Sequence, residues 1–455
     1  MKIVIFILTF QFFLFSSLMA QSPSLSGFGH VSQSLELSPA TIPEMKFYCG
    51  LPDANVFSAT NYTLQDIFST EGDSLRLDLA KWNSANSGAL QTQLNQRLRL
   101  FDIGFSLNPK NYIYLGGSAQ LNQNIALPAG MLSFVESGKS LNFNGFNLNA
   151  SAHSEYFIGA VQRFGDFTIG IRYKFLNGIF NLETVKNQFD VKTGPDSIII
   201  LTDLQFRSSN LQGRNDLGEL ATKIPSVNEF LPISGNIGHA IDFGVNYSLK
   251  EKFIFTFSTL NILGSINWSN NLTLYSSHSN YNYLGPVINV GSGDSLNIFS
   301  SIQDSLESQF SIDTIPSSVG YRTTLPAQLI FQFHYQPLNP LGVGLIYRQP
   351  LNNHDLLNFG PSAVAYVEGK WKHHVAGRIA YNFSKLQSGI AGLVSLRIPY
   401  LGLQTFFGVE SIRPFYAQSL TKLFQFQAGL SFCFDRRFRP VVVSSVTQSP
   451  QPSNP

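Results

Sequence analysis

The sequence is poor in charged residues, in cysteine and in long apolar runs. Charged residues make up 13% of the chain, against roughly 25% in an ordinary soluble domain. Two cysteines in 455 residues exclude a disulfide-dense scaffold, and a formal net charge of +2 gives no sign of nucleic-acid binding. No run of ~18 consecutive apolar residues is present, which excludes a transmembrane helix. No nucleic-acid partner is therefore expected.

The sequence also lacks the motifs of common catalytic and metal sites. Its eight histidines are scattered, and none lies in a nucleophile motif with a base beside it. Zinc and calcium ligand spacings are missing, as is a phosphate-binding loop. His373 and His374 fall in an expected turn, where solvation is a simpler interpretation than metal binding. We therefore predict that the protein is not an enzyme and needs no cofactor.

Aromatic residues are abundant, with 40 Phe and 17 Tyr, and they alternate with small polar residues. The clearest case is residues 423–434, where Phe424 and Phe426 share one face of an extended strand and Gln425 and Gln427 share the other. A strand with one apolar and one polar face suits the wall of a transmembrane barrel, with lipid outside and water inside. By itself the pattern also fits a strand of a soluble sandwich.

The same alternation recurs along the chain, which predicts an all-β protein. We expect a closed antiparallel transmembrane β-barrel of about fourteen strands, since bacterial single-chain barrels have an even count and both termini in the periplasm. A hairpin over residues 179–206 would lie above the membrane or raise the count to sixteen. The expected strands lie near 46–60, 101–107, 112–121, 154–163, 167–175, 241–247, 253–257, 329–335, 341–348, 363–368, 375–383, 393–398, 401–410 and 423–434.

The connections between these strands sort by length. Every second connection is a short turn, such as 108–111 and 164–166, whereas most of the others are long, such as 177–238 and 263–327. Short periplasmic turns and long extracellular loops are typical of outer-membrane barrels. In the longest loop, apolar residues between Leu296 and Phe310 recur at helical spacing. That helix would form a packed lid or, alternatively, a surface that receives an apolar ligand.

The chain divides into four segments. Residues 1–20 resemble a signal peptide, with Lys2, an apolar stretch and cleavage near Ala20. Residues 21–45 are the predicted plug. The interior of a barrel of about eight strands is filled by its own side chains, whereas a wider barrel needs a further segment to fill its lumen. Residues 46–434 form the barrel, and residues 435–455 form a periplasmic tail of disordered composition. The predicted location is the outer membrane of a Gram-negative bacterium.

Charged residues of both signs fall on the inward face of the expected strands. One interpretation is a salt-bridged network that lines the lumen; the alternative is a gate or a head-group site for a charged ligand. The lumen-lining candidates are Asp102, Arg172, Lys174, Asp242, Arg348, Glu368, Arg378, Arg397 and Glu410.

Two segments near the start suggest a family. Residues 36–43 (Glu-Leu-Ser-Pro-Ala-Thr-Ile-Pro) and 46–52 (Lys-Phe-Tyr-Cys-Gly-Leu-Pro) resemble the opening of an uncharacterised outer-membrane barrel family of Bacteroidota-type bacteria. That family is similar in architecture to the long-chain fatty-acid transporter (FadL-like) barrels. The resemblance implies fourteen strands and an N-terminal plug. Ser38, Pro39 and Ala40 stand where the fatty-acid transporters carry an Asn-Pro-Ala box in their hatch, with Ser in place of Asn.

These features favour a barrel that passes or binds a small hydrophobic compound. Its expected partners are outer-membrane lipid, such a ligand, and envelope proteins. The alternative is a non-transporting scaffold or accessory barrel of a protein-secretion or gliding complex, and a third is a soluble secreted β-protein. An apolar pocket would favour transport, whereas a fully packed lumen would favour the scaffold.

The two cysteines test the barrel closure. Cys49 lies near the start of the first expected strand and Cys433 near the end of the last. Closure makes these strands neighbours, which would bring the two Cα atoms within ~10 Å, about two strand spacings. Alternation places Cys433 on the lumen face and Cys49 on the lipid face. Because cysteines on opposite faces cannot bridge without distortion, we predict that they are close and not bonded.

Overall fold

The computed structural model describes residues 23–71, 74–78, 81, 89–128, 141–142, 145–194, 198–210, 235–250, 252–283, 313–338, 340–352, 360–371, 374–398 and 401–435. The predicted signal peptide, the helix expected at 296–310 and nearly all of the tail lie outside the described residues.

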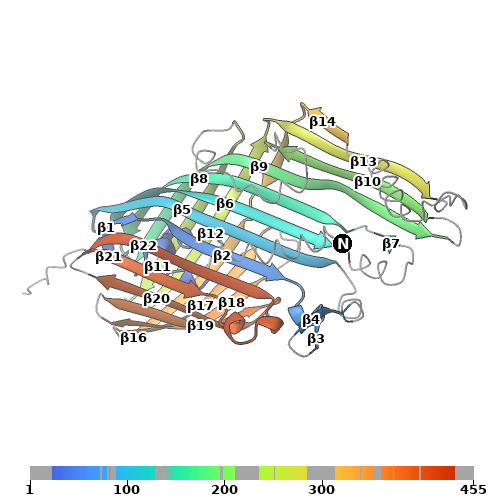
Figure 1. Ribbon diagram of the computed structural model, residues 1–455. Coiled ribbons are helices and arrows are strands. Elements are labelled where there is room, and N and C mark those ends of the chain that lie inside the picture. Colours follow the sequence, from blue (N-terminus) through green and yellow to red (C-terminus); the bar gives the residue numbers. More distant parts are fainter. Residues whose placement is uncertain are drawn as a thin grey trace, which may run out of the picture.

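Within the described residues, fourteen antiparallel strands close into a barrel (Figure 1). The last strand pairs with the first, and the first pairs with the second, so the wall has no free edge. The predicted closed barrel of fourteen strands is therefore confirmed. In wall order the strands are β1 (Met45–Gly50) continued by β2 (Asp53–Thr60), β5 (Leu90–Asn108), β6 (Asn111–Leu127), β8 (Asn147–Phe164), β9 (Phe167–Thr193), β11 (Ile237–Leu249), β12 (Phe253–Trp268), β16 (Gln328–Leu338), β17 (Leu341–Pro350), β18 (Ser362–Trp371), β19 (Val375–Ser384), β20 (Gly389–Ile398), β21 (Leu403–Val409) and β22 (Leu423–Asp435).

The first wall strand is broken at Leu51 and Pro52, between β1 and β2. Proline has no N–H to donate to the ladder, so the regular pairing stops there. Both halves nevertheless pair with the same two neighbours, β22 and β5. Cys49 lies opposite Phe432, and Tyr48 lies opposite Cys433. The two cysteines do not form a disulfide, and they lie on adjacent strands and opposite faces as predicted.

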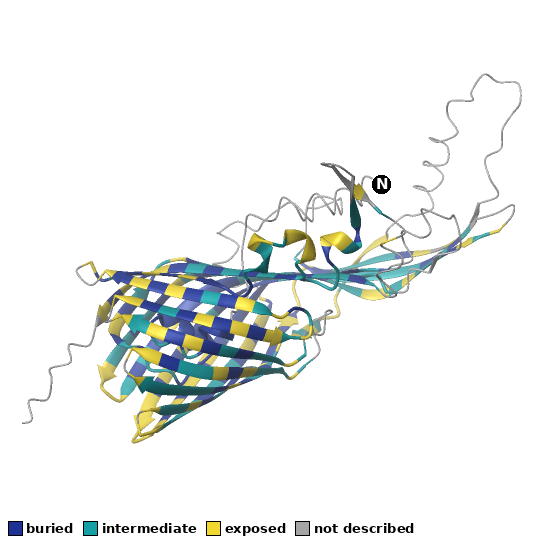
Figure 2. Cartoon of the chain, turned by 90° about the horizontal axis from the view of Figure 1, so that it is seen from below, coloured by how far each residue is buried: buried dark blue, intermediate teal, exposed yellow. Residues whose placement is uncertain are grey.

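Exposed and buried residues alternate along the wall strands (Figure 2), and many of the exposed ones are large and apolar. Leu345 and Ile379, for example, are 55% and 70% exposed. The residues that alternation places on the lipid face are exposed or half-exposed: Phe243, Val245, Tyr247, Leu341, Val343, Leu345, Phe424, Phe426 and Leu430. The residues that it places on the inner face are buried, namely Asp242, Gly244, Gln425 and Gln427, except for the half-buried Arg348.

The wall is much taller on one side than on the other. β19 has 10 residues, about the ~9–11 that a membrane-spanning strand needs, whereas β9 has 27. We call the end that carries Met45 and Asp435 the near rim and the opposite end the far rim. β5, β6, β8 and β9 all continue past the far rim of the short side (Figures 1 and 2). Loops predicted at 61–97 and 122–153 are therefore partly strand.

The tallest part of the sheet adds strands of its own. β10 (Ile198–Ser209) pairs with the upper part of β9, and β13 (Leu272–Tyr283) pairs with β10. The hairpin foreseen over 179–206 thus extends the sheet beyond the wall and adds no wall strand. Three short strands complete this region: β7 (Leu141–Asn142) beside β9, β14 (Asp313–Ser317) beside β13, and β15 (Tyr321–Thr324) beside β12.

Small elements decorate the barrel. The helical turns are η2 (Pro23–Leu25), η3 (Ser32–Glu36), η4 (Leu64–Asp66), η5 (Arg413–Phe415) and η6 (Gln418–Leu420). β3 (Phe68–Glu71) and β4 (Ser74–Leu77) form a separate hairpin. Apolar spacing over residues 75–82 also fits a short helix, but residues 75–77 pair with β3 instead. No helix in the described ranges is long and apolar enough to span a membrane.

Candidate functional site

Residues 23–44, which we call the N-terminal segment, lie against the inward face of the wall. Nearly all of them are buried, and they contact wall strands on opposite sides of the barrel. Ser38, Pro39 and Ala40 sit beside β9 and β11. Asn246 donates a hydrogen bond to the Ala40 carbonyl at 3.0 Å, and a Cβ added at Gly170 would lie 2.1 Å from the Pro39 oxygen. Any side chain at position 170 would therefore displace the segment.

One side of the segment is apolar. This side of the segment packs against inward-facing residues of β12 and of β16 to β21, which form the short side of the wall. The segment contributes Leu25, Phe28, Val31 and Leu37 to this cluster, and the wall contributes Leu260, Ile330, Ile346, Val364, Tyr366, Ala376, Ala380, Ala391, Leu393 and Phe406. Burial of these side chains removes apolar surface from water, which holds the segment against this part of the wall.

The other side of the segment meets a buried charge cluster on β2, β5, β8, β9 and β11. Glu36 of the segment pairs with Arg97 at 2.8 Å and also with Arg99. Buried charges are tolerated when each is paired, and the cluster meets this condition through a chain of contacts. They are Arg99 to Asp53 (3.2 Å) and Asp102 (2.6 Å), Arg97 and Lys174 to Glu155 (both 3.5 Å), and Arg172 (2.5 Å) and Lys174 (3.0 Å) to Asp242.

Three wall arginines also bind the backbone of the segment. Arg172 donates to the carbonyls of residues 35 (3.2 Å) and 36 (2.8 Å). Arg378 donates to those of residues 24 (2.5 Å) and 26 (2.8 Å) and pairs with Glu368 at 2.6 Å. Arg397 donates to the carbonyl of His30 at 3.1 Å. Because these arginines belong to β9, β19 and β20, the segment is attached on both sides of the lumen.

The two ends of the segment have attachments of their own. At the start, the backbone N–H of Ser24 donates to Glu410 at 2.8 Å. At the end, Glu44 pairs with Lys370 at 2.7 Å near the near rim. Burial alone would raise the pKa of Glu44, but Lys370, with His30 and Arg397, holds that pKa below its usual value.

All the lumen-lining candidates from the sequence have inward positions. Asp102, Arg172, Lys174, Asp242, Glu368, Arg378, Arg397 and Glu410 are buried, while Arg348 is half-buried and donates to Gln328. Sequence reasoning missed Glu36, Asp53, Arg97, Arg99 and Glu155. Arg97 and Arg99 alternate in step with Gln93 and Asn95, and this polar alternation was the signal that could have extended β5 into the expected loop.

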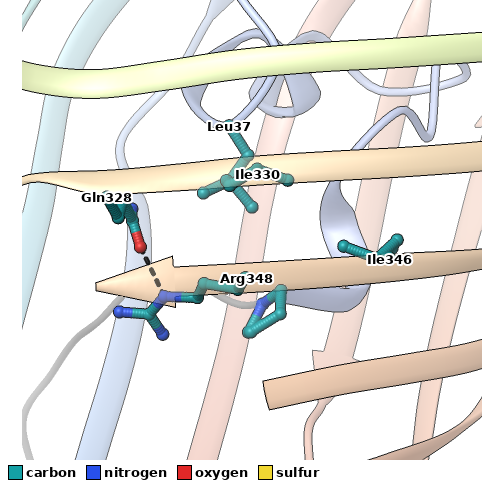
Figure 3. A pocket seen from close by; sticks show the side chains of 6 residues that line it. Leu37, Gln328, Ile330, Ile346 and Arg348 are labelled. Atoms are coloured by element: carbon teal, nitrogen blue, oxygen red, sulfur yellow. Dashed lines mark hydrogen bonds between the residues drawn. The ribbon is translucent and has the colours of Figure 1, made fainter. Parts of the chain in front are cut away.

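A small cavity of about 10 Å³ lies in the lumen beside the segment, where Pro23 and Leu37 meet Ile330, Ile346 and the Arg348–Gln328 pair (Figure 3). One water molecule would fill it. Within the described ranges no group of three His, Cys, Asp or Glu side chains could hold a metal ion.

The chain matches the model of one protein family over most of its length. The model of a family described as "Family of unknown function (DUF5723)" matches residues 39–408. The chain belongs to the DUF5723 family. That match starts within the N-terminal segment at Pro39 and ends in β21, so it covers the wall strands of the DUF5723 barrel except β22. The expected membership of an uncharacterised barrel family is confirmed. No curated protein matches the chain.

Several solved structures resemble this DUF5723 barrel in fold. The toluene transporter TbuX of Ralstonia pickettii has 10% identity and a TM-score of 0.43, over 89% of this chain and 94% of its own. The toluene transporter TodX of Pseudomonas putida has 9% identity and a TM-score of 0.43, over 91% and 97%. A FadL homologue of Pseudomonas aeruginosa has 8% identity and a TM-score of 0.43, over 92% and 100%.

Proposed function

We propose that this protein is a gated transporter of small hydrophobic compounds in the outer membrane of a Gram-negative bacterium. The N-terminal segment is its plug, and the near rim faces the periplasm. Removal of the plug from the lumen opens the path. The observation that carries this proposal is the two-sided environment of residues 23–44, which pack on an apolar surface and are tethered by charged groups.

The tethers suit a plug that moves. Glu36 and the carbonyls bound by Arg172, Arg378 and Arg397 make polar contacts that water can replace when the plug leaves. The charge cluster on the wall keeps partners among its own members, such as Arg172 with Asp242. Displacement of the plug therefore does not leave every buried charge without a partner. Unpaired buried charges would be the largest free-energy cost of opening.

The apolar side supports the class of solute. Leu25, Phe28 and Val31 cover an apolar surface that includes Ile330 and Ile346. When the plug withdraws, this surface lines one side of the path. A small hydrophobic molecule that replaces the plug's side chains keeps that surface out of water, whereas a charged solute does not.

Two measurements test the proposal. Deletion of residues 23–43 should raise single-channel conductance in planar bilayers. In cells with an intact outer membrane, expression of the full chain should raise uptake of the apolar dye N-phenyl-1-naphthylamine above that of an empty vector. Replacement of Ile346 by Arg should abolish this gain, while Ile379→Thr, on the outer face, should not. Conductance unchanged by the deletion, or dye uptake equal to the empty vector, would overturn the proposal.

A second candidate function is a non-transporting scaffold in an envelope complex. The observation in its favour is the burial of most of residues 23–44 inside the barrel. A scaffold predicts that chemical crosslinking in cells captures the same envelope protein with the full chain and with Ile346→Arg, and that neither raises dye uptake.

A further inference from the structure

Near the far rim, the inward face of the tall side of the wall carries rows of amide side chains. Six of them form what we call the amide ladder: Gln93 and Asn95 on β5, Asn122 and Asn124 on β6, Asn149 on β8 and Asn181 on β9. In the first row Gln93 lies opposite Asn124, which lies opposite Asn149. In the second row Asn95 lies opposite Asn122, then Ser151, then Asn181. Neighbouring members of a row are therefore one strand spacing apart, ~4.8 Å.

The ladder lies toward the far rim. On β5, β6 and β8 the exposed large apolar residues stop at Phe101, Leu115 and Ile158, and the ladder begins beyond them. On β9, Asn181 lies between the exposed Tyr173 and Val185. The ladder residues continue the parity of the inward-facing Arg97, Ser118 and Glu155, so they face the mouth of the barrel. Figure 2 shows this part of the sheet projecting past the short side of the wall.

Within the described ranges, two buried side-chain atoms beneath this surface lack a hydrogen-bond partner. The Oδ1 atom of Asn124 has no hydrogen-bond partner among the described residues. One row closer to the membrane, the side chain of His153 is 3% exposed, and its Nε2 atom likewise has no partner in the described part of the chain. A buried polar group without a partner costs about 1–3 kcal/mol. A ligand that supplies both donors and acceptors here would recover that cost.

Aromatic rings bracket the second row. At one end Phe57 of β2 is inward-facing and half-buried, opposite Asn95. At the other end the Tyr321 hydroxyl donates to Asn181 at 2.7 Å, and the Arg207 guanidinium lies 4.2 Å from the centroid of the Tyr321 ring. The second row therefore starts beside Phe57 on β2 and ends at the Tyr321 hydroxyl on β15, where the Tyr321 ring also contacts Arg207 and Trp268.

We propose that the amide ladder binds an oligosaccharide at the far mouth of the barrel. Sugar hydroxyls donate and accept hydrogen bonds, as side-chain amides do, and the strand spacing is close to the length of one pyranose ring. The polarised C–H face of a sugar packs on the negative face of an aromatic ring. A peptide strand would need an unpaired sheet edge, whereas the ladder lies on the face of strands that are paired on both sides.

This inference goes beyond the proposed transport of hydrophobic compounds. The test is isothermal titration of the full chain in detergent with three probes, maltohexaose, cellohexaose and chitohexaose. At least one should bind. The double variant Asn122→Leu/Asn124→Leu should weaken that binding at least tenfold. The matched control is Gln123→Leu, which lies between them on β6 and points to the opposite face; it should stay within twofold of the wild type.

A folding check keeps the test decisive. Heat-dependent mobility on gels reports an intact barrel, and if the double variant fails that check, Phe57→Ala replaces it with the same expected loss. The inference is overturned if none of the three probes binds, or if the folded variant binds like the wild type. Dye uptake and conductance do not depend on the ladder, so failure here is distinct from failure of the transport proposal.

Discussion

Glu36 should hold the N-terminal segment in place far more strongly than Glu44 does, although both acids belong to that segment. Glu36 lies among Arg97 and Arg99, and all three side chains are at most 5% exposed. Removal of one partner from a buried ion pair costs about 3–5 kcal/mol. The substitution Glu36→Gln retains an acceptor oxygen, so we take the lower end, ~3 kcal/mol.

That loss of free energy changes the ratio of displaced to seated segment. A tenfold change corresponds to about 1.4 kcal/mol, so Glu36→Gln should raise the ratio of displaced to seated segment about 100-fold. Glu44→Gln is the matched control, because the side chains of Glu44 and Lys370 are 35% and 26% exposed. An exposed pair contributes ~0.2–1 kcal/mol, which allows at most a fivefold change.

Single-channel recording in planar bilayers measures both variants. The expected result is frequent opening for Glu36→Gln and near wild-type behaviour for Glu44→Gln, at equal barrel content judged by heat-dependent gel mobility. If the two variants open equally often, the charge cluster does not hold the segment. If Glu36→Gln unfolds at lower temperature but never opens, the cluster stabilises the wall alone.

Two further predictions concern the wall. Val343→Arg places a charge on the lipid face, which costs ~2–4 kcal/mol at the bilayer midplane. The folding yield of this variant in lipid vesicles should therefore fall well below that of Arg348→Ala. Similar yields for the two variants would contradict the assigned faces. The wild type should show no mobility shift on reduction, because Cys49 and Cys433 are on opposite faces. The variant Tyr48→Cys should show one, since residues 48 and 433 are directly opposite, and Cα atoms of such pairs, ~4.5–5.5 Å apart, suit a disulfide.

Alternation was sufficient to predict the wall, because outward residues of a lipid-facing strand are apolar while many inward ones are small or polar. Residues 424–433 show this directly. Where one face no longer meets lipid, the pattern weakens. The upper parts of β5, β6 and β8 therefore escaped prediction, and Arg97 and Arg99 with them.

The contacts of the N-terminal segment were the least predictable part of the site. The need to fill a wide lumen predicted a plug, and Ser38–Ala40 were expected near the wall. Nothing local indicates that Glu36 meets β5 or that Arg378 reaches residues 24 and 26. These contacts join residues far apart in sequence, and their register is set by the whole closed barrel.

The contacts of the wall arginines with the segment affect which substitutions the segment tolerates. Arg172, Arg378 and Arg397 bind carbonyl oxygens, which every amino acid possesses. Side chains at positions 24, 26, 30 and 35 can then be exchanged without loss of these attachments, provided that they fit the space. In relatives we expect the side chains of this stretch to vary in sequence, while the three arginines that bind its backbone are conserved.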